Sequence, residues 1–292
     1  MTDTILVPTD GSTESERALD IAIPLAKALN LSITLFWCWE GLPDLDEAFA
    51  EGFVDEIINR ETTDRAAAAD QLAHSRIKPH GIDHQIESSV GHPAEQLLDL
   101  IDSTKPRFVA ISTHGRSGFK RWRLGSVADR VVRNAEADTI IVSPDETTQL
   151  APEIGKIVVP LDGSDRAEKA LADAVQIARA TGASLILVRA FITVLATTPM
   201  GLDVAYTQAN EAAMSSAHRY LDEIAAQIDD VPVQKEVFSG EASQAIIEAG
   251  ADADLIVMAS HGRGGLARMA LGSVTDAVIR GSHKPVLVDR VD

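Results

Sequence analysis

The chain has 292 residues, a formal net charge of −18 and 45% hydrophobic residues. At about 150 residues per domain this length predicts two domains, and the composition is globular rather than disordered. Acids outnumber bases in both halves, which disfavours nonspecific contact with nucleic acid and with anionic membranes. Because Cys38 is the single cysteine, an intramolecular disulfide and a zinc cluster are excluded.

Targeting signals are absent from the N-terminal residues, which carry no basic segment and run straight into a strand-like stretch. The longest weakly polar stretch, Ala190–Tyr206, is interrupted by threonines, a proline and an aspartate. It therefore falls short of the roughly 18 consecutive apolar residues that a transmembrane helix needs. We expect a soluble, cytoplasmic protein that binds no nucleic acid and does not insert into a membrane.

Two copies of one sequence pattern make up the chain. Ile5–Ser12 recurs as Ile157–Ser164, 152 residues later, and Ser112–Ser126 recurs as Ala259–Ser273, 147 residues later. The first copy therefore has a longer middle. Such duplication predicts two similar domains in tandem.

The predicted domains cover residues 1–146 and 153–292, with a polar linker near Pro144–Gly155. Within each, apolar runs alternate with helical periodicity. The predicted strands of the first half are Thr4–Pro8, Ile33–Cys38, His84–Ser88, Arg107–Ser112 and Thr139–Val142. The predicted helices are Leu19–Leu29, Glu56–Ile77, Pro93–Asp102 and Ser126–Ala135. The predicted strands of the second half are Lys156–Pro160, Leu185–Ala190, Val233–Phe238, Leu255–Ala259 and Val286–Val288.

The start of the first helix in each half shows the spacing of a capping box. The predicted capping pairs are Thr13 with Glu16 and Asp165 with Glu168.

Alternation of strands and helices predicts an α/β fold with two tandem flavodoxin-like sheets. Each would be an open, five-stranded parallel sheet with strand order 3-2-1-4-5 and helices on both faces. Ligands of such sheets bind beyond the carboxyl ends of the strands, where the winding direction reverses. Asp10 and Asp162, after the first strands, would then face the loops after the fourth strands.

Those loops are rich in glycine and are the strongest functional signal. In each, nine residues separate one glycine from a Gly-Ser pair. The glycines and serines are Gly115, Gly125 and Ser126 in the first loop and Gly262, Gly272 and Ser273 in the second. Glycine lets backbone N–H groups approach a ligand, and the helix that begins at the serine favours anions at its N-terminus. One such loop is compatible with a purely structural turn, whereas two with identical spacing favour a phosphate or nucleotide site.

The P-loop and the dinucleotide-binding fingerprint are both missing from the sequence. Asp10 and Asp162 have two interpretations that stay open: a turn before a helix, or acceptors for a ribose or base. His114 and His261 lack partners at metal-ligand spacing, so we interpret them as loop-packing residues rather than general acids or bases. Cys38 is interpreted as a small buried residue rather than a nucleophile.

On these motifs the sequence resembles the tandem form of the universal stress protein family over essentially the whole chain. The ATP-binding members carry Gly, two residues, Gly, nine residues, then Gly followed by Ser or Thr. The second and third glycines and the serine match in both halves, whereas the first glycine is replaced by Ser112 and by Ala259. Both replacements are small, so a ribose could still approach.

The resemblance implies ATP as the ligand, with Mg²⁺ carried by the nucleotide because no dedicated metal site is visible. It implies that Asp10 and Asp162 contact the nucleoside and that the amides of Val127 and Val274 help to hold phosphates. The ends of the second strands, near Cys38 and Ala190, would lie by adenine. It also implies that the halves form a pseudo-dimer through their final strands, Thr139–Val142 and Val286–Val288. A homodimer of two chains stays open.

The function that the resemblance implies is a regulatory or protective role in the stress response, without committed catalysis. A slow ATPase or adenylate-forming enzyme is one alternative, although no catalytic base is identified near the loops. A nucleotide-free interaction module is the other. We expect at least the second site to bind nucleotide, because its loop is slimmer and has Gly264 and Gly265, whereas the first loop carries more positive charge but contains the bulky Phe119 and Trp122.

Overall fold

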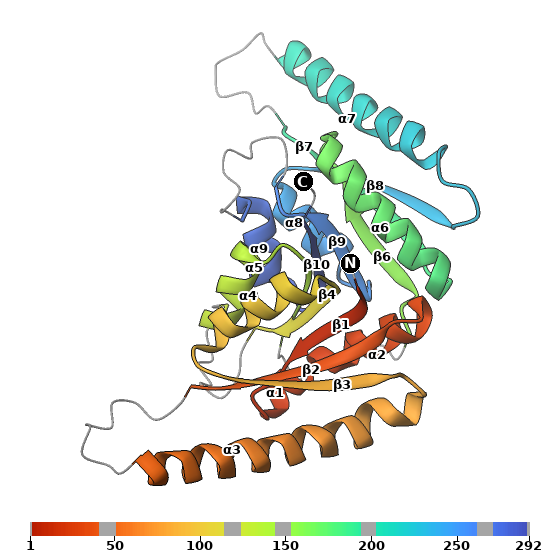
Figure 1. Cartoon of the computed structure of the whole chain (residues 1–292). Coiled ribbons are helices and arrows are strands. Elements are labelled where there is room, and N and C mark those ends of the chain that lie inside the picture. The colour runs from red at the N-terminus through yellow and green to blue at the C-terminus, as the bar shows by residue number, and fades with distance from the viewer. Residues whose placement is uncertain are drawn as a thin grey trace. The chain divides into compact units, whose positions relative to one another are not determined.

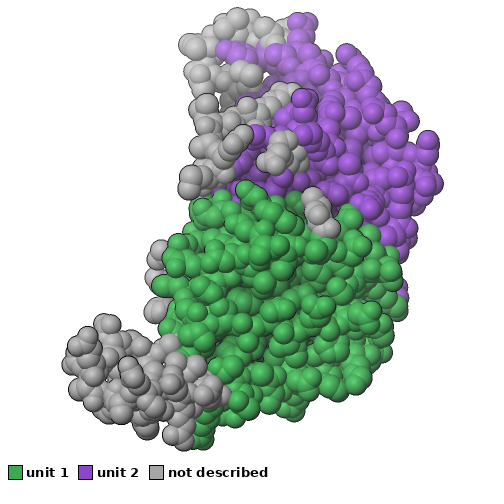
Figure 2. Space-filling model, in the orientation of Figure 1, with its two compact units in different colours: residues 1–152 green, residues 153–292 purple. Residues whose placement is uncertain are grey.

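The structure of the chain, a computed structural model, describes residues 2–40, 51–113, 124–143, 153–193, 203–261 and 271–290. The chain divides into two compact units, residues 1–152 and 153–292 (Figure 2). In both units strands alternate with helices (Figure 1). The predicted α/β fold class is therefore confirmed.

The first unit contains a parallel sheet of strand order β3-β2-β1-β4-β5. Its strands are β1 (Thr2–Pro8), β2 (Ser32–Trp39), β3 (His84–Val90), β4 (Pro106–Ser112) and β5 (Asp138–Val142). Its helices are α1 (Thr13–Glu16), α2 (Ala18–Leu29), α3 (Glu51–Leu72), α4 (Pro93–Thr104) and α5 (Ser126–Asn134). A π-helical turn, η1 (Ala73–Ile77), and a 3₁₀ turn, η2 (Lys78–His80), follow α3. The predicted order 3-2-1-4-5 is confirmed.

The second unit repeats this order as β8-β7-β6-β9-β10, again with parallel pairing. Its strands are β6 (Lys156–Pro160), β7 (Ser184–Phe191), β8 (Val233–Ser239), β9 (Leu255–Ala259) and β10 (Val286–Asp289). Its helices are α6 (Asp165–Thr181), α7 (Asp203–Ala225), α8 (Ala242–Ala249) and α9 (Ser273–Gly281). None of the helices within the described ranges is long and apolar enough to cross a membrane.

Central strands carry continuous apolar runs because both faces of the sheet are covered. In β1, Ile5, Leu6 and Val7 are each at most 1% exposed, whereas the outer strand β3 is largely exposed. In the first unit α2 and α3 lie on one face of the sheet and α4 and α5 on the other (Figure 1). This winding makes β1 and β4 neighbours at the point where the chain changes direction.

The first helix of each unit begins with a different cap from the predicted one. Ser12 and Ser164 have extended backbone, and their hydroxyls accept the amides of Ser15 at 3.2 Å and Ala167 at 3.3 Å. The predicted capping residues Thr13 and Asp165 were therefore wrong by one position, because both already have helical backbone.

The long helix of the first unit also differs from its prediction. A single helix was expected over Glu56–Ile77, but α3 begins at Glu51, and Ala73–Ile77 forms a π-helical turn. The amide of Lys78 donates to the carbonyl of Ala73 at the end of this turn. Pro79 follows Lys78, and proline has no backbone N–H to donate while its ring crowds the carbonyl four residues earlier. The helix accordingly loses its regular hydrogen bonding just before the proline.

Candidate functional site

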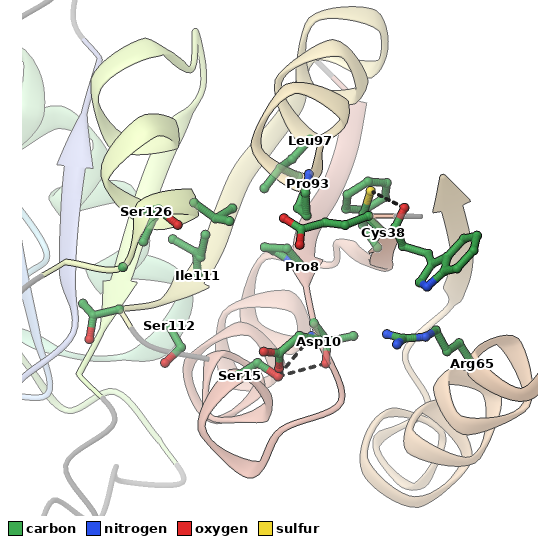
Figure 3. Close-up of a pocket in the computed structure, with 18 residues that line it drawn as sticks. Pro8, Asp10, Ser15, Cys38, Arg65, Pro93, Leu97, Ile111, Ser112 and Ser126 are labelled. Atoms are coloured by element: carbon green, nitrogen blue, oxygen red, sulfur yellow. Dashed lines mark hydrogen bonds between the residues drawn. The ribbon is translucent and has the colours of Figure 1, made fainter. Parts of the chain in front are cut away.

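A cavity of about 500 Å³ opens at the carboxyl ends of β1, β2 and β4 in the first unit (Figure 3). Its volume falls in the range of about 300 to 1,000 Å³ that is usual for ligand pockets. Five predicted site residues line it: Asp10, Ser112, Gly125, Ser126 and Val127. The fold thus brings together the end of the first strand and the Gly-Ser pair, which are more than a hundred residues apart in the sequence.

Asp10 holds the turn between β1 and α1. Its Oδ1 accepts the amide of Ser12 at 2.9 Å and the hydroxyl of Ser12 at 2.5 Å. Gly11 completes the turn with a φ of 77°, a left-handed conformation that glycine adopts without steric cost. Asp10 therefore forms the turn before α1, and the same residue also lines the cavity.

The N-terminus of α5 forms the opposite side of the cavity. Gly125 is its N-cap, and the Gly125 amide donates to the carbonyl of Thr113 at 2.6 Å. Along α5, the first amide that donates to a backbone carbonyl of the helix start is that of Asp129, which bonds to the carbonyl of the N-cap residue Gly125 at 2.8 Å. The preceding amides, those of Ser126 and Val127 among them, lie at the helix terminus, where backbone dipoles favour an anion. They, rather than the Gly125 amide, are the donors available to a ligand.

Ser112 adds a polar atom to the cavity wall. The residue is only 7% exposed, and its Oγ is buried without a hydrogen-bond partner in the described part of the chain. A buried hydroxyl without a partner costs roughly 1–3 kcal/mol. Since Ser112 lines the cavity, a polar ligand atom there would satisfy it. Ser112 thus brings both a hydrogen-bond donor and an acceptor to the site.

The end of β2 supplies Cys38, Trp39 and Glu40 to the same cavity. Burial, reinforced by the negative charge of Glu40, raises the pKa of the Cys38 thiol to about 11. The thiol donates to the carbonyl of Gly91 over 3.2 Å. Cys38 is therefore a neutral, half-buried wall residue near neutral pH, which agrees with its interpretation as a packing residue.

Several lining residues were missed by sequence reasoning, chiefly Arg65 of α3 and Pro93 and Leu97 of α4. The two α4 residues reach the site only because the chain crosses to the other face of the sheet after β3. The sequence did contain a signal for Arg65, because it begins a series of residues spaced at intervals of four: Arg65, Ala69, Ala73 and Ile77. Positions spaced by four share one helix face, so an arginine in line with buried apolar residues indicates a side chain directed toward the sheet.

The second unit reproduces the turn and the helix start. Oδ1 of Asp162 accepts the amide of Ser164 at 3.0 Å and its hydroxyl at 2.6 Å. The amide of Gly272 donates to the carbonyl of Ser260 at 2.9 Å. A Cβ at Gly272 would lie only 3.0 Å from that carbonyl oxygen, a contact so tight that the backbone would have to shift by a few tenths of an ångström. The remaining predicted residues lie at the ends of β7 and β9 and at the start of α9: Ala190, Ala259, Ser273 and Val274.

A polar cluster distinguishes the surroundings of Asp162. The hydroxyl of Tyr220 donates to Glu168 at 3.0 Å, and the guanidinium carbon of Arg189 lies 4.1 Å from the Tyr220 ring centre. Burial and the hydrogen bond to Glu168 raise the pKa of Tyr220 well above its usual value, and the charge of Asp162 adds to this. Asp162 is therefore electrostatically coupled to the Tyr220 phenol.

His261, which follows β9, is only 8% exposed. Its Nδ1 lies 3.3 Å from Oγ of Ser260, and its Nε2 is buried without a partner among the residues that the structure describes. Burial and the charges of Arg166 and Arg290 lower its pKa, so the ring is neutral at pH 7. The predicted residues Gly115 and Gly262, with His114 and the basic side chains of both glycine loops, lie outside the described ranges.

The fold and this cavity define a flavodoxin-like α/β protein with a ligand-sized site at the switch point of its sheet. The model of the universal stress protein family matches residues 1–143 and 153–290. The chain therefore belongs to the universal stress protein family, in its tandem two-domain form.

Individual relatives agree with this assignment. A universal stress protein of Mycobacterium tuberculosis is 34% identical over 198 residues, which is 68% of this chain and 66% of the relative. One from Mycolicibacterium smegmatis is 26% identical over 290 residues, covering 98% and 96% of the two chains. The crystal structure of a universal stress protein from Archaeoglobus fulgidus superposes with a TM-score of 0.70 at 24% identity, covering 99% of this chain and 98% of the other. That likeness supports the fold.

Proposed function

We propose that the cavity of the first unit binds an adenine nucleotide such as ATP, and that the chain is a nucleotide-responsive regulatory or protective protein of the stress response. The observation that carries the proposal is one cavity that combines a helix N-terminus, an unpartnered buried hydroxyl and a carboxylate. These groups match the three parts of a nucleotide: phosphates, sugar hydroxyls and base.

Each group has a role in this proposal. The amides of Ser126 and Val127 at the start of α5 hold phosphate oxygens, since a helix N-terminus attracts anions. The hydroxyl of Ser112 bonds to a sugar or phosphate oxygen, and Asp10 accepts from the sugar or the base. Cys38 lies toward the base, at the end of β2. Mg²⁺ accompanies the phosphates and supplies charge neutralisation.

The negative net charge of the protein makes the helix N-terminus important for binding an anionic ligand. The chain carries a net charge of −18, so its long-range field repels a polyphosphate. Within the cavity, backbone dipoles and a metal ion bound to the phosphates offset that repulsion locally. We therefore expect the affinity for ATP to depend on Mg²⁺ and on ionic strength.

Thermal unfolding in the presence of Mg²⁺ and ATP tests the proposal. A ligand at a hundred times its Kd stabilises the folded state by about 2.7 kcal/mol, which raises Tm measurably. The matched variant is Ser126→Asp, at an exposed position in the first turn of α5. An acidic residue there favours the helix dipole but repels phosphate, so the variant should lose the part of the ATP-induced rise that binding in the first unit contributes, without losing stability. If the Tm of wild type is the same with and without millimolar ATP, the protein is instead a nucleotide-free interaction module.

The second unit has the same turn at Asp162 and the same helix start at Ser273, so we extend the proposal to it. Phosphate release measured over hours on the same samples distinguishes simple binding from a slow ATPase. Release that exceeds the uncatalysed rate and is abolished by Asp162→Ala, with ATP binding retained, would assign turnover to this unit.

A further inference from the structure

Arg65 of α3 is the one basic side chain among the described residues that line the cavity. It reaches the site from the face of the sheet that α2 and α3 cover, whereas Pro93, Leu97 and the start of α5 approach from the other face. Its side chain is 27% exposed and points into the pocket on the side of Asp10 (Figure 3).

Two contacts fix the Arg65 guanidinium. Nε donates to Oε2 of Glu61, one helical turn earlier, at 3.2 Å. The guanidinium carbon lies 5.9 Å from the ring centre of Trp37, within the distance of a cation–π contact. A guanidinium has five N–H donors and no acceptor, and Glu61 uses only the one on Nε. The Nη donors therefore have no acceptor within the part of the chain that the structure describes.

The strand order determines which end of a ligand these donors meet. Phosphates at the start of α5 lie on the β4 side of the cavity, while Arg65 lies by Trp37 on the β2 side. β1 separates β2 from β4, which places the two sides about 10 Å apart at roughly 4.8 Å per strand. A nucleotide spanning this distance presents its nucleoside end to Arg65.

We infer that Arg65 is a ligand-binding residue that donates through its Nη atoms to the ring nitrogens or sugar oxygens of the nucleoside bound in the first unit. This inference rests on the proposed function and adds to it a recognition residue outside the glycine loop. It predicts that the uncharged nucleoside, as well as the nucleotide, depends on the arginine.

The second unit has no basic residue at the position on its long helix that corresponds to Arg65. Ala69 of α3 and Ala217 of α7 are the corresponding buried alanines of the long helices, 5% and 2% exposed. The residue one turn earlier is Arg65 in α3 but Ala213 in α7. In the second unit an arginine is instead on the strand, at Arg189, where it stacks on Tyr220. The two sites therefore recognise the nucleoside differently, and loss of Arg65 affects the first alone.

The three tryptophans of the chain allow the first site to be observed separately. Trp37, Trp39 and Trp122 all belong to the first unit, so intrinsic tryptophan fluorescence reports on that unit alone. We would titrate wild type, Arg65→Gln and Arg60→Gln with Mg²⁺ and ATP, and separately with adenosine. Arg60 is the matched control, since it lies on the same helix with an 83% exposed side chain and, among the side chains that the structure describes, pairs with Asp64.

Arg65→Gln should raise the Kd for ATP and for adenosine by about tenfold or more, because it removes charge-assisted hydrogen bonds to the nucleoside. Arg60→Gln should bind both ligands with Kd values within about twofold of those of wild type, since exposed charges contribute little to binding. Ser126→Asp should weaken ATP but not adenosine. Adenosine carries no charge, so its weakened binding to Arg65→Gln separates a direct contact from a general loss of positive charge.

An adenosine Kd that is the same for Arg65→Gln and wild type overturns the inference while leaving the proposed function intact. Wild type that binds neither ATP nor adenosine overturns both. Circular dichroism checks that Arg65→Gln is folded. Should it not fold, Arg65→Lys replaces it, because lysine keeps the charge but loses the planar fork. Its adenosine Kd should then rise severalfold, and a wild-type value would overturn the inference.

Discussion

The hydroxyl of Ser12 lies 2.5 Å from Oδ1 of Asp10, and Ser164 repeats this contact with Asp162 at 2.6 Å. In each unit the serine also donates its amide to the same carboxylate oxygen and caps the first helix. The repeated Asp-Gly-Ser sequence is therefore a structural unit that fixes the carboxylate at the end of the central strand. A side chain held in this way can bind a ligand without a further loss of conformational freedom.

Replacement of the capping serine tests this arrangement. Ser12→Ala should lower the free energy of unfolding by about 1 kcal/mol, since it removes the N-cap acceptor. Thr13→Ala, at the neighbouring exposed position first expected to cap the helix, should change it by less than about 0.5 kcal/mol. Urea unfolding of both variants measures the difference. Equal effects would mean that the helix does not depend on the Ser12 hydroxyl.

The glycine at the start of α9 offers a second prediction. In Gly272→Ala the new Cβ would lie 3.0 Å from the backbone oxygen of Ser260, which cannot rotate away. We expect a loss of about 1–3 kcal/mol in unfolding free energy, as for other overpacked sites.

Gly155→Ala is the matched control for Gly272→Ala. Its Cβ would meet only Oδ2 of Asp254, at 3.5 Å, an ordinary contact. We expect it to be neutral, or to stabilise the protein by about 0.4–1 kcal/mol because alanine lowers the conformational entropy of the unfolded chain. Thermal unfolding compares the two, and a Gly272→Ala variant as stable as Gly155→Ala would show that the turn relaxes without cost.

Most of the fold could be predicted from sequence because its signals are local and duplicated. The apolar runs placed the strands within one or two residues, and the duplication made the tandem architecture evident. The cap at Ser12 was missed because the capping-box spacing with Glu16 favours Thr13, whereas Ser12 caps the helix without a Glu or Gln three residues later. Only the backbone conformation decides between the two. The π-helical turn after α3 was missed because helical periodicity does not distinguish i+4 from i+5 bonding.

The candidate site was predictable only in part. Asp10 and Ser126 follow strands that the parallel topology makes neighbours, so sequence order was enough to bring them together. Arg65 and Leu97 come from helices on opposite faces of the sheet, and only their rotation about the helix axis directs them into the cavity. That rotation follows from packing against β2 and β3, which a sequence pattern specifies weakly.

The single cysteine allows a test of the electrostatics of the cavity. With a pKa raised to about 11 by burial and by Glu40, the Cys38 thiol is almost fully protonated at pH 8 and should react slowly with iodoacetamide. Glu40→Gln removes a negative charge that disfavours the thiolate, so the pKa should fall and labelling should accelerate. Mass spectrometry of the intact chain follows one adduct without ambiguity.

Glu87→Gln is the control for the labelling experiment. It makes the same change in net charge at an exposed position on β3, and the pKa of Cys38 does not depend on it. Its labelling rate should equal that of wild type. If both substitutions accelerated labelling equally, the effect would come from the net charge of the protein rather than from Glu40. If Glu40→Gln did not accelerate labelling, Glu40 would not contribute to the raised pKa of Cys38. ATP in the cavity should further slow the labelling of wild type.

The buried imidazole of His261 should make the second unit sensitive to acid. Burial and the charges of Arg166 and Arg290 lower its pKa in the folded state below the value of about 6.5 expected in the unfolded chain. Between these two values the unfolded state binds more protons, so the stability is fully present above about pH 6.5 and falls as the pH drops below it.

His261→Gln removes this titration while keeping a polar group beside Ser260. The unfolding free energy of wild type should therefore fall more steeply than that of the variant between about pH 6.5 and pH 5. Urea unfolding at half-unit pH intervals gives both curves, and the contributions of the other histidines cancel in their difference. Parallel curves would mean that His261 gains a proton as easily in the folded state as in the unfolded chain. The difference should lie in the slope with pH, because the variant can differ in absolute stability through packing alone.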